Sequence, residues 1–581
     1  MQKFLLNSVT PLQVLKKYFG YDSFRPLQTE IINSVLTGND TLAILPTGGG
    51  KSLCFQIPTL VMAEQNGGQN GTLCLVITPL IALMKDQVEN LKQRDIRAAA
   101  IYTGLPYEKQ RIALDNCQFG PYRFLYVSPE RLVSDDFRKR LAQLPVRLIA
   151  VDEAHCISQW GHDFRPSYTR IAEIRELFDH RIPILALTAT ATTEVAQDIV
   201  RHLSLNNTDD WKMFRQSVHR DNLNYIVRYC SDSKEKQQQL IHILSSVQGS
   251  AIVYVRNRKR TEELAQLLDD NRITANSYHA GLDTLERAAR QESWRKTQCR
   301  VMVCTNAFGM GIDKPDVRIV LHYDLPDSPE AYFQEAGRAG RDGQNAYCVL
   351  LYAPEDRVKA RKRVSDNFPP EEFVCRVYHN TCDFLQIGEG SGLGHTFALH
   401  MDKLCQVMHL PLLQTYAALH LLSQAGWIEF HDEQETQPRV RINVSRETMY
   451  ELNLNKQQEQ LLQFLMRQYT GIFTDLQYIS GVDDAMHELL VSLAQRHIVT
   501  YLPRTVACAL TMVKERQADV FLPQRVWAER RKHYVTRLAA MIEYAEQKQF
   551  CREQVLAGYF GEVDAPPCGK CDVCRTAKIT K

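Results

Sequence analysis

The sequence lacks the features that mark several special classes of protein. No stretch approaches the roughly 20 apolar residues of a membrane-spanning helix, and residues 1–7 have no apolar core or cleavage site of a signal peptide. The net charge is only +2, so any nucleic-acid binding has to come from local patches. The 16 cysteines stand singly except for one group near the end, which argues against a disulfide framework. We therefore expect a cytoplasmic protein of roughly three to five domains, without a membrane segment.

A glycine-rich turn lies between an apolar run at residues 41–45 and a helix-like stretch at 53–57. Glycines let the backbone N–H groups approach a phosphate closely, and the following helix directs its positive N-terminal end at the same group. Lys51 would reach the β- and γ-phosphates, and Ser52 would ligate Mg²⁺. A strict phosphate loop has Gly at the position of Leu45, so a plain glycine turn is the alternative. The predicted nucleotide-binding residues of this turn are Gly48, Gly49, Gly50, Lys51 and Ser52.

Further short apolar runs, at residues 73–77, 123–127, 148–151 and 184–187, are typical of a parallel sheet buried on both faces. Ligands gather at the C-terminal ends of such strands. Asp152 and Glu153 directly follow one run. We expect Asp152 to hold Mg²⁺, usually through water, and Glu153 to deprotonate the attacking water. A helix N-cap is the alternative interpretation of this pair.

Two further segments could contact bases, one the adenine of a nucleotide and the other the bases of a nucleic acid. Gln28 offers a carboxamide for the edge of adenine, and Phe19 could cover the base. Residues 156–168 are rich in aromatic side chains, His and Arg, and could stack nucleic-acid bases next to the ATP site. An ordinary loop packed under its own aromatic rings is the alternative. The candidate DNA contacts in this segment are Trp160, His162, Phe164 and Arg165.

A second α/β pattern follows residues 222–235, which look like a crossing between lobes. Its strands are predicted at residues 251–255, 274–278, 301–304, 319–321 and 346–351. Thr305 follows one strand and is a further candidate DNA contact. Arg338 and Arg341 lie three apart on a predicted helix and would share a face. Two such guanidinium groups suit a γ-phosphate presented by another lobe.

Taken in order, these motifs resemble those of superfamily 2 helicases, specifically the RecQ family, over residues 15–355. The resemblance rests on Phe24-Arg-Pro-Leu-Gln28, Thr47 to Ser52, Asp152 to His155, the aromatic-rich segment, Thr188-Ala-Thr190, and Gln334 to Arg341. It implies two RecA-like lobes, ATP in the cleft, and an ATP-dependent 3′→5′ DNA helicase with single-stranded DNA across both lobes. It also implies that Arg25, Thr47 and Gln334 belong to the ATP site.

The region after residue 355 departs from RecQ proteins, in which a zinc module, then a winged helix, follow the second lobe. A helix at 412–422, begun by Pro411, precedes apolar segments at 427–430 and 439–444 joined by an acidic turn. This pattern predicts a winged helix, and residues 489–502 form a fainter second copy. Helix–hairpin packing without a DNA role is the alternative.

The last region carries Cys551, Cys568, Cys571 and Cys574. Four thiolates at these spacings fit a closed zinc site, although closely spaced cysteines also suit an iron–sulfur cluster. The flanking residues resemble the RecQ zinc module and favour zinc. Cys375 and Cys382 lack a second pair and are interpreted as structural. We expect the tail to fold back on the second lobe through a helix at 525–549, whose basic residues could line a DNA path. Those residues are Arg525, Arg530, Arg531, Lys532 and Arg537.

The sequence thus predicts an α/β protein of two tandem RecA-like parallel-sheet lobes, a mainly helical winged-helix-like region and a small C-terminal zinc module. The expected boundaries are 1–208, 209–355, 356–524 and 525–581. The expected ligands are ATP, Mg²⁺, Zn²⁺ and single-stranded and duplex DNA, with a single-strand-binding protein as a possible partner and the nucleoid as the location in a bacterium. We expect roles in repair, recombination and replication. The alternative function is a DNA-binding or strand-annealing factor in which ATP hydrolysis only switches DNA binding, without processive unwinding.

Overall fold

The structure, a computed structural model, describes residues 9–579 except for a few short gaps. These gaps are 69, 103–104, 159–160, 162–163, 205–210, 310–313, 437, 446–447, 449–451, 453, 470, 474–476, 480–481, 497 and 503–504. The chain divides into two units: residues up to Arg361 together with those from Lys532, and the intervening Lys362–Arg531. Among the described residues we find no helix with the length and apolar character that a bilayer crossing demands.

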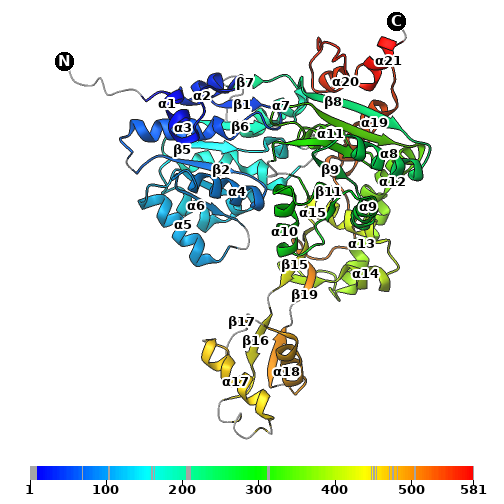
Figure 1. Ribbon diagram of the computed structural model, residues 1–581. Helices are drawn as coiled ribbons and strands as arrows, with labels where there is room; N and C mark the ends of the chain where they lie inside the picture. The colour runs from blue at the N-terminus through cyan, green and yellow to red at the C-terminus, as the bar shows by residue number, and fades with distance from the viewer. Residues whose placement is uncertain are drawn as a thin grey trace, which may run out of the picture. The chain divides into compact units, whose positions relative to one another are not determined.

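The first lobe is built on a seven-stranded parallel sheet, drawn in blue and cyan in Figure 1. Its strands, in spatial order, are β3 (Ala98–Ile101), β4 (Phe124–Val127), β2 (Leu73–Ile77), β5 (Val146–Val151), β6 (Ile184–Thr188), β1 (Thr41–Ile44) and β7 (Lys212–Arg215). The sequence prediction missed the edge strands β3 and β7. Because β7 pairs with β1, the first lobe extends past residue 208.

Both faces of this sheet are buried because successive side chains of a strand point to opposite faces. Leu42 and Ile44 pack into one core, whereas Ala43 packs into the other. The helices on the Ala43 face are α2 (Gln28–Leu36), α3 (Leu53–Gln65) and α4 (Ile81–Lys92). Those on the opposite face are α5 (Tyr107–Phe119), α6 (Asp135–Leu141) and α7 (Thr193–Leu203). The unalternating apolar runs of the sequence are therefore explained by burial on both sides.

The second lobe has a six-stranded parallel sheet. Its strands, in spatial order, are β10 (Ala275–Tyr278), β11 (Val301–Cys304), β9 (Ser250–Tyr254), β12 (Val317–His322), β13 (Ala346–Tyr352) and β8 (Leu223–Tyr229). β8 pairs with β13, so the segment predicted as a plain crossing is the edge strand of this lobe. Helices α8 (Ser233–Ser246) and α9 (Arg258–Asp270) cover one face. Near the other face lie α10 (Thr284–Arg295) and α11 (Pro329–Ala336), which carries Tyr332.

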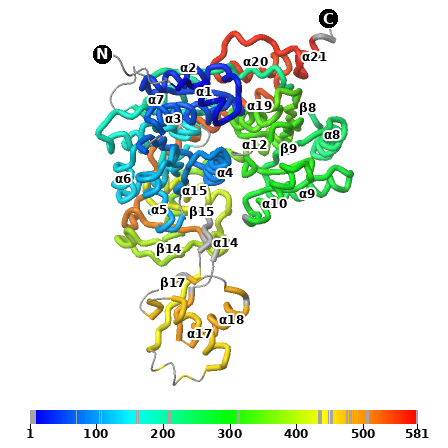
Figure 2. Tube along the Cα trace, turned by 60° about the vertical axis from the view of Figure 1, so that its left-hand side comes forward, coloured from blue at the N-terminus to red at the C-terminus, as the bar shows by residue number. Residues whose placement is uncertain are grey.

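The C-terminal segment returns to the second lobe, as the sequence predicts. It consists of α19 (Arg530–Glu546), α20 (Arg552–Tyr559) and α21 (Asp572–Ile579). The ring of Tyr544 on α19 lies 5.3 Å from that of Tyr332, and both side chains are fully buried. Phe560 lies 5.0 Å from Phe333, and Figure 2 shows α20 and α21, in red, beside β8. The tail is thus part of the aromatic core of the second lobe.

The other unit, Lys362–Arg531, contains two three-stranded antiparallel sheets. The first pairs β14 (Thr396–Leu399) and β15 (Ile428–Thr436) with β19 (Thr505–Met512), and packs on α13 (Glu371–Phe384), α14 (Met401–Val407) and α15 (Leu412–Gln424). The second pairs β17 (Gln477–Tyr478) and β18 (Val499–Leu502) with β16 (Arg439–Ile442), and packs on α17 (Lys456–Gln468) and α18 (Asp484–Gln495).

The predicted hairpin of the winged helix is therefore wrong in its pairing. The strand after α15 pairs with β19, which is far along the chain, and not with residues 439–444. Those residues instead open the second helix-and-sheet motif, which is inserted between β15 and β19. An apolar strand specifies its partner through side-chain packing on a shared core, and local order along the chain cannot reveal this. The helix and strand of the fainter second copy are present as α18 and β18.

Candidate ATP site and zinc centre

The glycine-rich turn connects β1 to α3 and is held from beside by the start of α2. The Gln28 side chain donates from Nε2 to the carbonyl oxygen of Gly50 at 3.0 Å, and its Oε1 accepts from the backbone N–H of Arg25 at 2.9 Å. Gly50 has φ +80°, and a Cβ there would lie 2.3 Å from Nε2 of Gln28. Only glycine fits this combination of positive φ and close approach. Gln28 thus lies at the turn, and its reading of adenine stays a prediction.

A pocket of about 590 Å³ opens above this turn and is lined by both lobes of the unit. From the first lobe it contains Phe19, Arg25, Gln28, Thr47, Gly48, Gly50, Lys51, Ser52, Asp152 and Glu153. From the second lobe it contains Gln334, Arg338 and Arg341. Gly49 lies within the same turn, where its carbonyl oxygen is 3.4 Å from Nε2 of Gln28. The fold therefore brings the residues predicted for ATP to one place, although their individual roles stay predictions.

In the acidic pair at the end of β5, Glu153 is buried and Asp152 is half-buried. Burial, with the nearby Glu153 carboxylate adding to it and Lys51 opposing it, raises the pKa of Asp152 to about 6. Glu153 has φ +47°, and its backbone N–H donates to Oδ1 of Asp152 at 3.0 Å. A half-buried carboxylate that lines the same pocket as Lys51 and Ser52 fits the ligand preference of Mg²⁺ for oxygen. Ser52 and Asp152 are the residues that would hold this ion, which would screen the phosphate charges.

Glu153 is connected to the next strand end through a histidine. Nδ1 of His155 lies 3.4 Å from Oε2 of Glu153 and 3.0 Å from Oγ1 of Thr188. Oγ1 of Thr188 in turn accepts from the backbone N–H of Thr190 at 3.3 Å. His155 thus lies between Glu153 and the residues at the end of β6.

The two arginines of the second lobe differ in their surroundings. A Cβ on Gly48 would lie 3.5 Å from Cγ of Arg341, so the Arg341 side chain lies against the glycine-rich turn. The Arg338 guanidinium donates to the carbonyl oxygen of Gly309 and is buried. The prediction that both lie on one helix is wrong, because α11 ends at Ala336 and the arginines follow in a glycine-rich turn. They nevertheless line the same pocket.

The four predicted zinc ligands meet at the start of α20 and α21. All four Sγ atoms lie within 4.8 Å of one another, with 3.4 Å between Cys551 and Cys568 and 3.9 Å between Cys551 and Cys571. Zn–S bonds of about 2.3 Å in a tetrahedron require S–S separations of about 3.8 Å, so the sulfurs fit zinc. Backbone N–H groups of Cys568, Cys571 and Cys574 donate to neighbouring sulfurs at 3.3–3.4 Å. The buried Arg552, paired with Asp572 at 2.9 Å, joins the two helices.

Comparison with known proteins identifies the family. Three family models match the chain: DEAD/DEAH box helicase over residues 25–199, helicase conserved C-terminal domain over 235–343 and RecQ zinc-binding over 512–575. The probable ATP-dependent DNA helicase RecS of Bacillus subtilis is 43% identical over 346 residues, which span 59% of this chain and 67% of that protein. The chain belongs to the RecQ family.

Other relatives agree with this assignment. The ATP-dependent DNA helicase RecQ of Haemophilus influenzae is 43% identical over 354 residues, which span 61% of this chain but only 55% of that protein. Two solved structures share the fold alone. The helicase MrfA bound to DNA has a TM-score of 0.51 at 18% identity, over 61% of this chain and 50% of that one. Dbp5 of S. cerevisiae has a TM-score of 0.50 at 17% identity, over 62% of this chain and 91% of that one. The RecQ zinc-binding match also favours zinc over an iron–sulfur cluster.

The residues predicted to contact DNA are less fully described in this RecQ protein. Trp160 and His162 lie outside the described residues. Phe164 is half-buried, and Arg165 donates from Nη1 to the carbonyl oxygen of Pro79 at 3.3 Å. Thr305 is buried, and its hydroxyl accepts from the backbone N–H of Ala307 at 3.4 Å. DNA contacts at these residues stay predictions.

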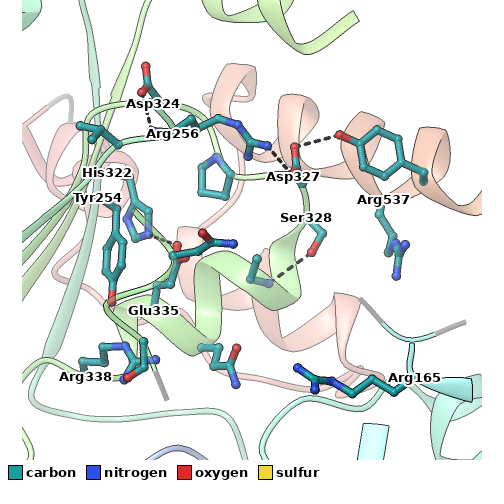
Figure 3. A pocket seen from close by; sticks show the side chains of 17 residues that line it. Arg165, Tyr254, Arg256, His322, Asp324, Asp327, Ser328, Glu335, Arg338 and Arg537 are labelled. Carbon is teal, nitrogen blue, oxygen red and sulfur yellow. Dashed lines mark hydrogen bonds and ion pairs between the residues drawn. The ribbon is translucent and has the colours of Figure 1, made fainter. Parts of the chain in front are cut away.

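A second pocket, of about 430 Å³, lies where Arg165 approaches the second lobe and α19 (Figure 3). Asp327 accepts from Nη2 of Arg256 at 2.7 Å and from the Tyr534 hydroxyl at 3.0 Å. Arg537, predicted to line a DNA path, borders this pocket, whereas Arg256, Asp327 and Tyr534 were missed. No local sequence signal marks these three, because they come from segments about 70 and 200 residues apart.

Proposed function

We propose that this RecQ protein is an ATP-dependent DNA helicase that unwinds duplex DNA in the 3′→5′ direction, in repair, recombination and replication. The observation that carries the proposal is the position of Arg341 against the glycine-rich turn of the other lobe. A site completed by two lobes hydrolyses ATP only when they meet, so hydrolysis can be coupled to relative movement of the lobes. The polarity follows from the family resemblance.

The geometry supports a defined role for each group. Lys51 and the N-terminus of α3 neutralise the phosphates. Glu153, held beside Asp152, accepts the proton of the attacking water. Arg341 approaches from the second lobe and stabilises the charge that develops on the transferred phosphoryl group. Mg²⁺, when bound at Ser52 and Asp152, would supply further charge neutralisation.

The second pocket supports a path for the DNA backbone beside the ATP site. Arg165 and Arg537 contribute positive charge there, Arg256 is paired with Asp327, and Arg338 lines both pockets. Phosphate contacts from arginines position a strand without reading its sequence. We propose that Arg338, shared by the two pockets, links strand binding to the ATP site.

The proposed domain division is a first lobe to about residue 216, a second lobe to about 361, an inserted pair of winged-helix-like motifs, and the zinc module. DNA contacts by the insert, an interaction with a single-strand-binding protein, and a cytoplasmic or nucleoid location are further parts of the proposal. The DNA contacts of the insert rest on its winged-helix-like pattern, and the partner and the location rest on the family resemblance.

Unwinding of a duplex with a 3′ single-stranded tail, with and without ATP, tests the proposal. Strand separation that requires ATP and fails with Glu153→Gln, while a 5′-tailed duplex stays intact, is the expected result. Annealing of complementary strands without any ATP-dependent unwinding would instead favour the strand-annealing alternative. Unwinding of only the 5′-tailed duplex would refute the polarity.

A further inference from the structure

The segment that joins β7 to β8, residues 216–222, is held on one side by the zinc module. Glu562 accepts from the backbone N–H of Val218 at 2.7 Å and from the Ser217 hydroxyl at 2.8 Å. Oε1 of the buried Glu553 accepts from the backbone N–H of Arg220 at 3.1 Å. The module therefore fixes the backbone of this interlobe linker at several points.

Further contacts come from a residue that lies between two zinc ligands. Lys570 lies in the Cys568-Gly-Lys-Cys571 turn, and its ammonium group donates to the carbonyl oxygens of Arg220 and Asp221. The position of Lys570 is set by the turn that the cysteines form. The linker is thus tied directly to the metal-binding turn.

On its other side, the linker holds the turn that carries the two arginines of the ATP site. The Arg220 guanidinium donates to the carbonyl oxygens of Gly337 at 3.2 Å and Gly340 at 2.6 Å. Nδ2 of Asn222 also donates to the oxygen of Gly340, at 2.6 Å. Gly340 has φ +58°, and a Cβ there would lie 2.5 Å from Nδ2 of Asn222, so glycine is required for this close approach.

The same turn touches the nucleotide-binding loop. A Cβ on Gly337 would lie 3.2 Å from Cβ and Oγ1 of Thr47. The turn begins where α11 ends, and several of its N–H groups pair with backbone carbonyls, including Gly340 with Val317 and Asp342 with Pro315. The Arg220 guanidinium adds a side-chain restraint, because it donates in a fixed fork to two carbonyl groups of the turn.

We propose that Arg220 is a positioning residue for ATP hydrolysis. The zinc module fixes the interlobe linker, and the hydrogen bonds of Arg220 in turn fix the turn that bears Arg338 and Arg341. The C-terminal module then governs the rate of hydrolysis without touching the nucleotide. The inference rests on the proposed ATPase function and deepens it.

Arg220→Ala tests the first half of the proposal. A misplacement of about 1 Å at a reacting group costs up to about 100-fold in rate, so we expect kcat for DNA-stimulated ATP hydrolysis to fall by about 10-fold. ATP affinity, measured with a fluorescent analogue, should change less than about twofold, because the nucleotide is held mainly by the first lobe. Arg228→Ala, an exposed arginine on neighbouring β8, is the matched control and should leave both values unchanged.

A double-mutant cycle separates positioning from a general loss of structure. In an Arg341→Ala background the guanidinium that Arg220 would position is already absent. Arg220→Ala should therefore lower kcat by less than about twofold. An equal loss in both backgrounds would overturn the inference. So would an ATP affinity that falls as much as kcat. A wild-type protein without ATPase activity would refute the proposed function instead.

Lys570→Met tests the second half and serves if Arg220→Ala does not fold. It removes the ammonium donor but keeps the aliphatic stem. We expect kcat to fall by about threefold, with one zinc per chain by metal analysis and an unchanged midpoint of thermal unfolding. Unchanged kcat would show that the module does not act through the linker. Loss of zinc together with kcat would mean that Lys570 only supports the metal turn, and would equally contradict the proposal.

Discussion

Replacing Arg341 with alanine removes a positive charge from the ATP pocket without emptying a core. The Arg341 side chain lies against Gly48 of the glycine-rich turn, where phosphates of a nucleotide are expected. The Arg338 guanidinium is more deeply buried and donates to the carbonyl oxygen of Gly309. Arg341→Ala therefore changes the less buried of the two proposed catalytic arginines.

The expected size of the effect follows from electrostatics. Two unit charges about 4 Å apart interact by about 4 kcal/mol at an effective dielectric constant of about 20. Since about 1.4 kcal/mol is a tenfold change in rate, the whole interaction corresponds to about 10³-fold. Only the part that strengthens in the transition state affects kcat, so we expect a fall in kcat of about 10²–10³-fold.

The assay is steady-state ATP hydrolysis at saturating single-stranded DNA, with nucleotide affinity measured separately. ATP affinity should weaken less than about tenfold, because the first lobe keeps its contacts. Arg295→Ala, at an arginine of α10 whose side chain is 65% exposed, is the matched control and should behave as wild type. A kcat for Arg341→Ala within about threefold of wild type would refute the role of this arginine in phosphoryl transfer.

The remaining predictions concern four other residues. Glu153→Gln should bind ATP as wild type but turn it over about 10²–10⁴-fold more slowly; near-normal turnover would contradict the assignment of the base. Burial and Glu153 raise the pKa of Asp152 to about 6, so this carboxyl becomes protonated as the pH falls below that value. The Mg²⁺ concentration for half-maximal ATPase should then rise by about tenfold per pH unit. A pH-independent Mg²⁺ concentration would be inconsistent with Asp152 as a ligand. Arg165→Ala should preserve the DNA-free ATPase but blunt its stimulation by single-stranded DNA, whereas equal loss of both would indicate a merely structural loop. Cys571→Ser should lose zinc by metal analysis and lower solubility, since structural zinc supplies on the order of 10 kcal/mol of folding free energy; Cys375→Ser is its control, and a full zinc content in the first variant would exclude a four-cysteine site.

The local chemistry of this protein was readable from sequence because it depends on residues that are neighbours in the chain. The three glycines before Lys51 and Ser52 predict a phosphate-binding turn through backbone freedom alone. Runs of apolar residues predict the strands of both lobes because a strand buried on two faces has no polar positions. The spacing of Cys568, Cys571 and Cys574 predicts a metal turn.

The tertiary structure alone decided which distant segments meet. The pairing of β15 with β19, the edge strands β7 and β8, and the return of Tyr544 to Tyr332 join residues that local patterns do not relate. Such contacts depend on side-chain packing on a shared core. Many other apolar segments have a composition that would also suit that core, so composition does not select the partner.

The same division separates the parts of the site. The motifs that line each half of the candidate ATP pocket occur within the sequence of one lobe. Only the fold brings Arg341 against Gly48 and places Arg220 between the zinc module and Gly340. The sequence indicated which groups are candidates for the chemistry, because their type and spacing are local properties. Their mutual positions were decided by the packing of two lobes and a returning tail, which fixes distances that no run of neighbouring residues encodes.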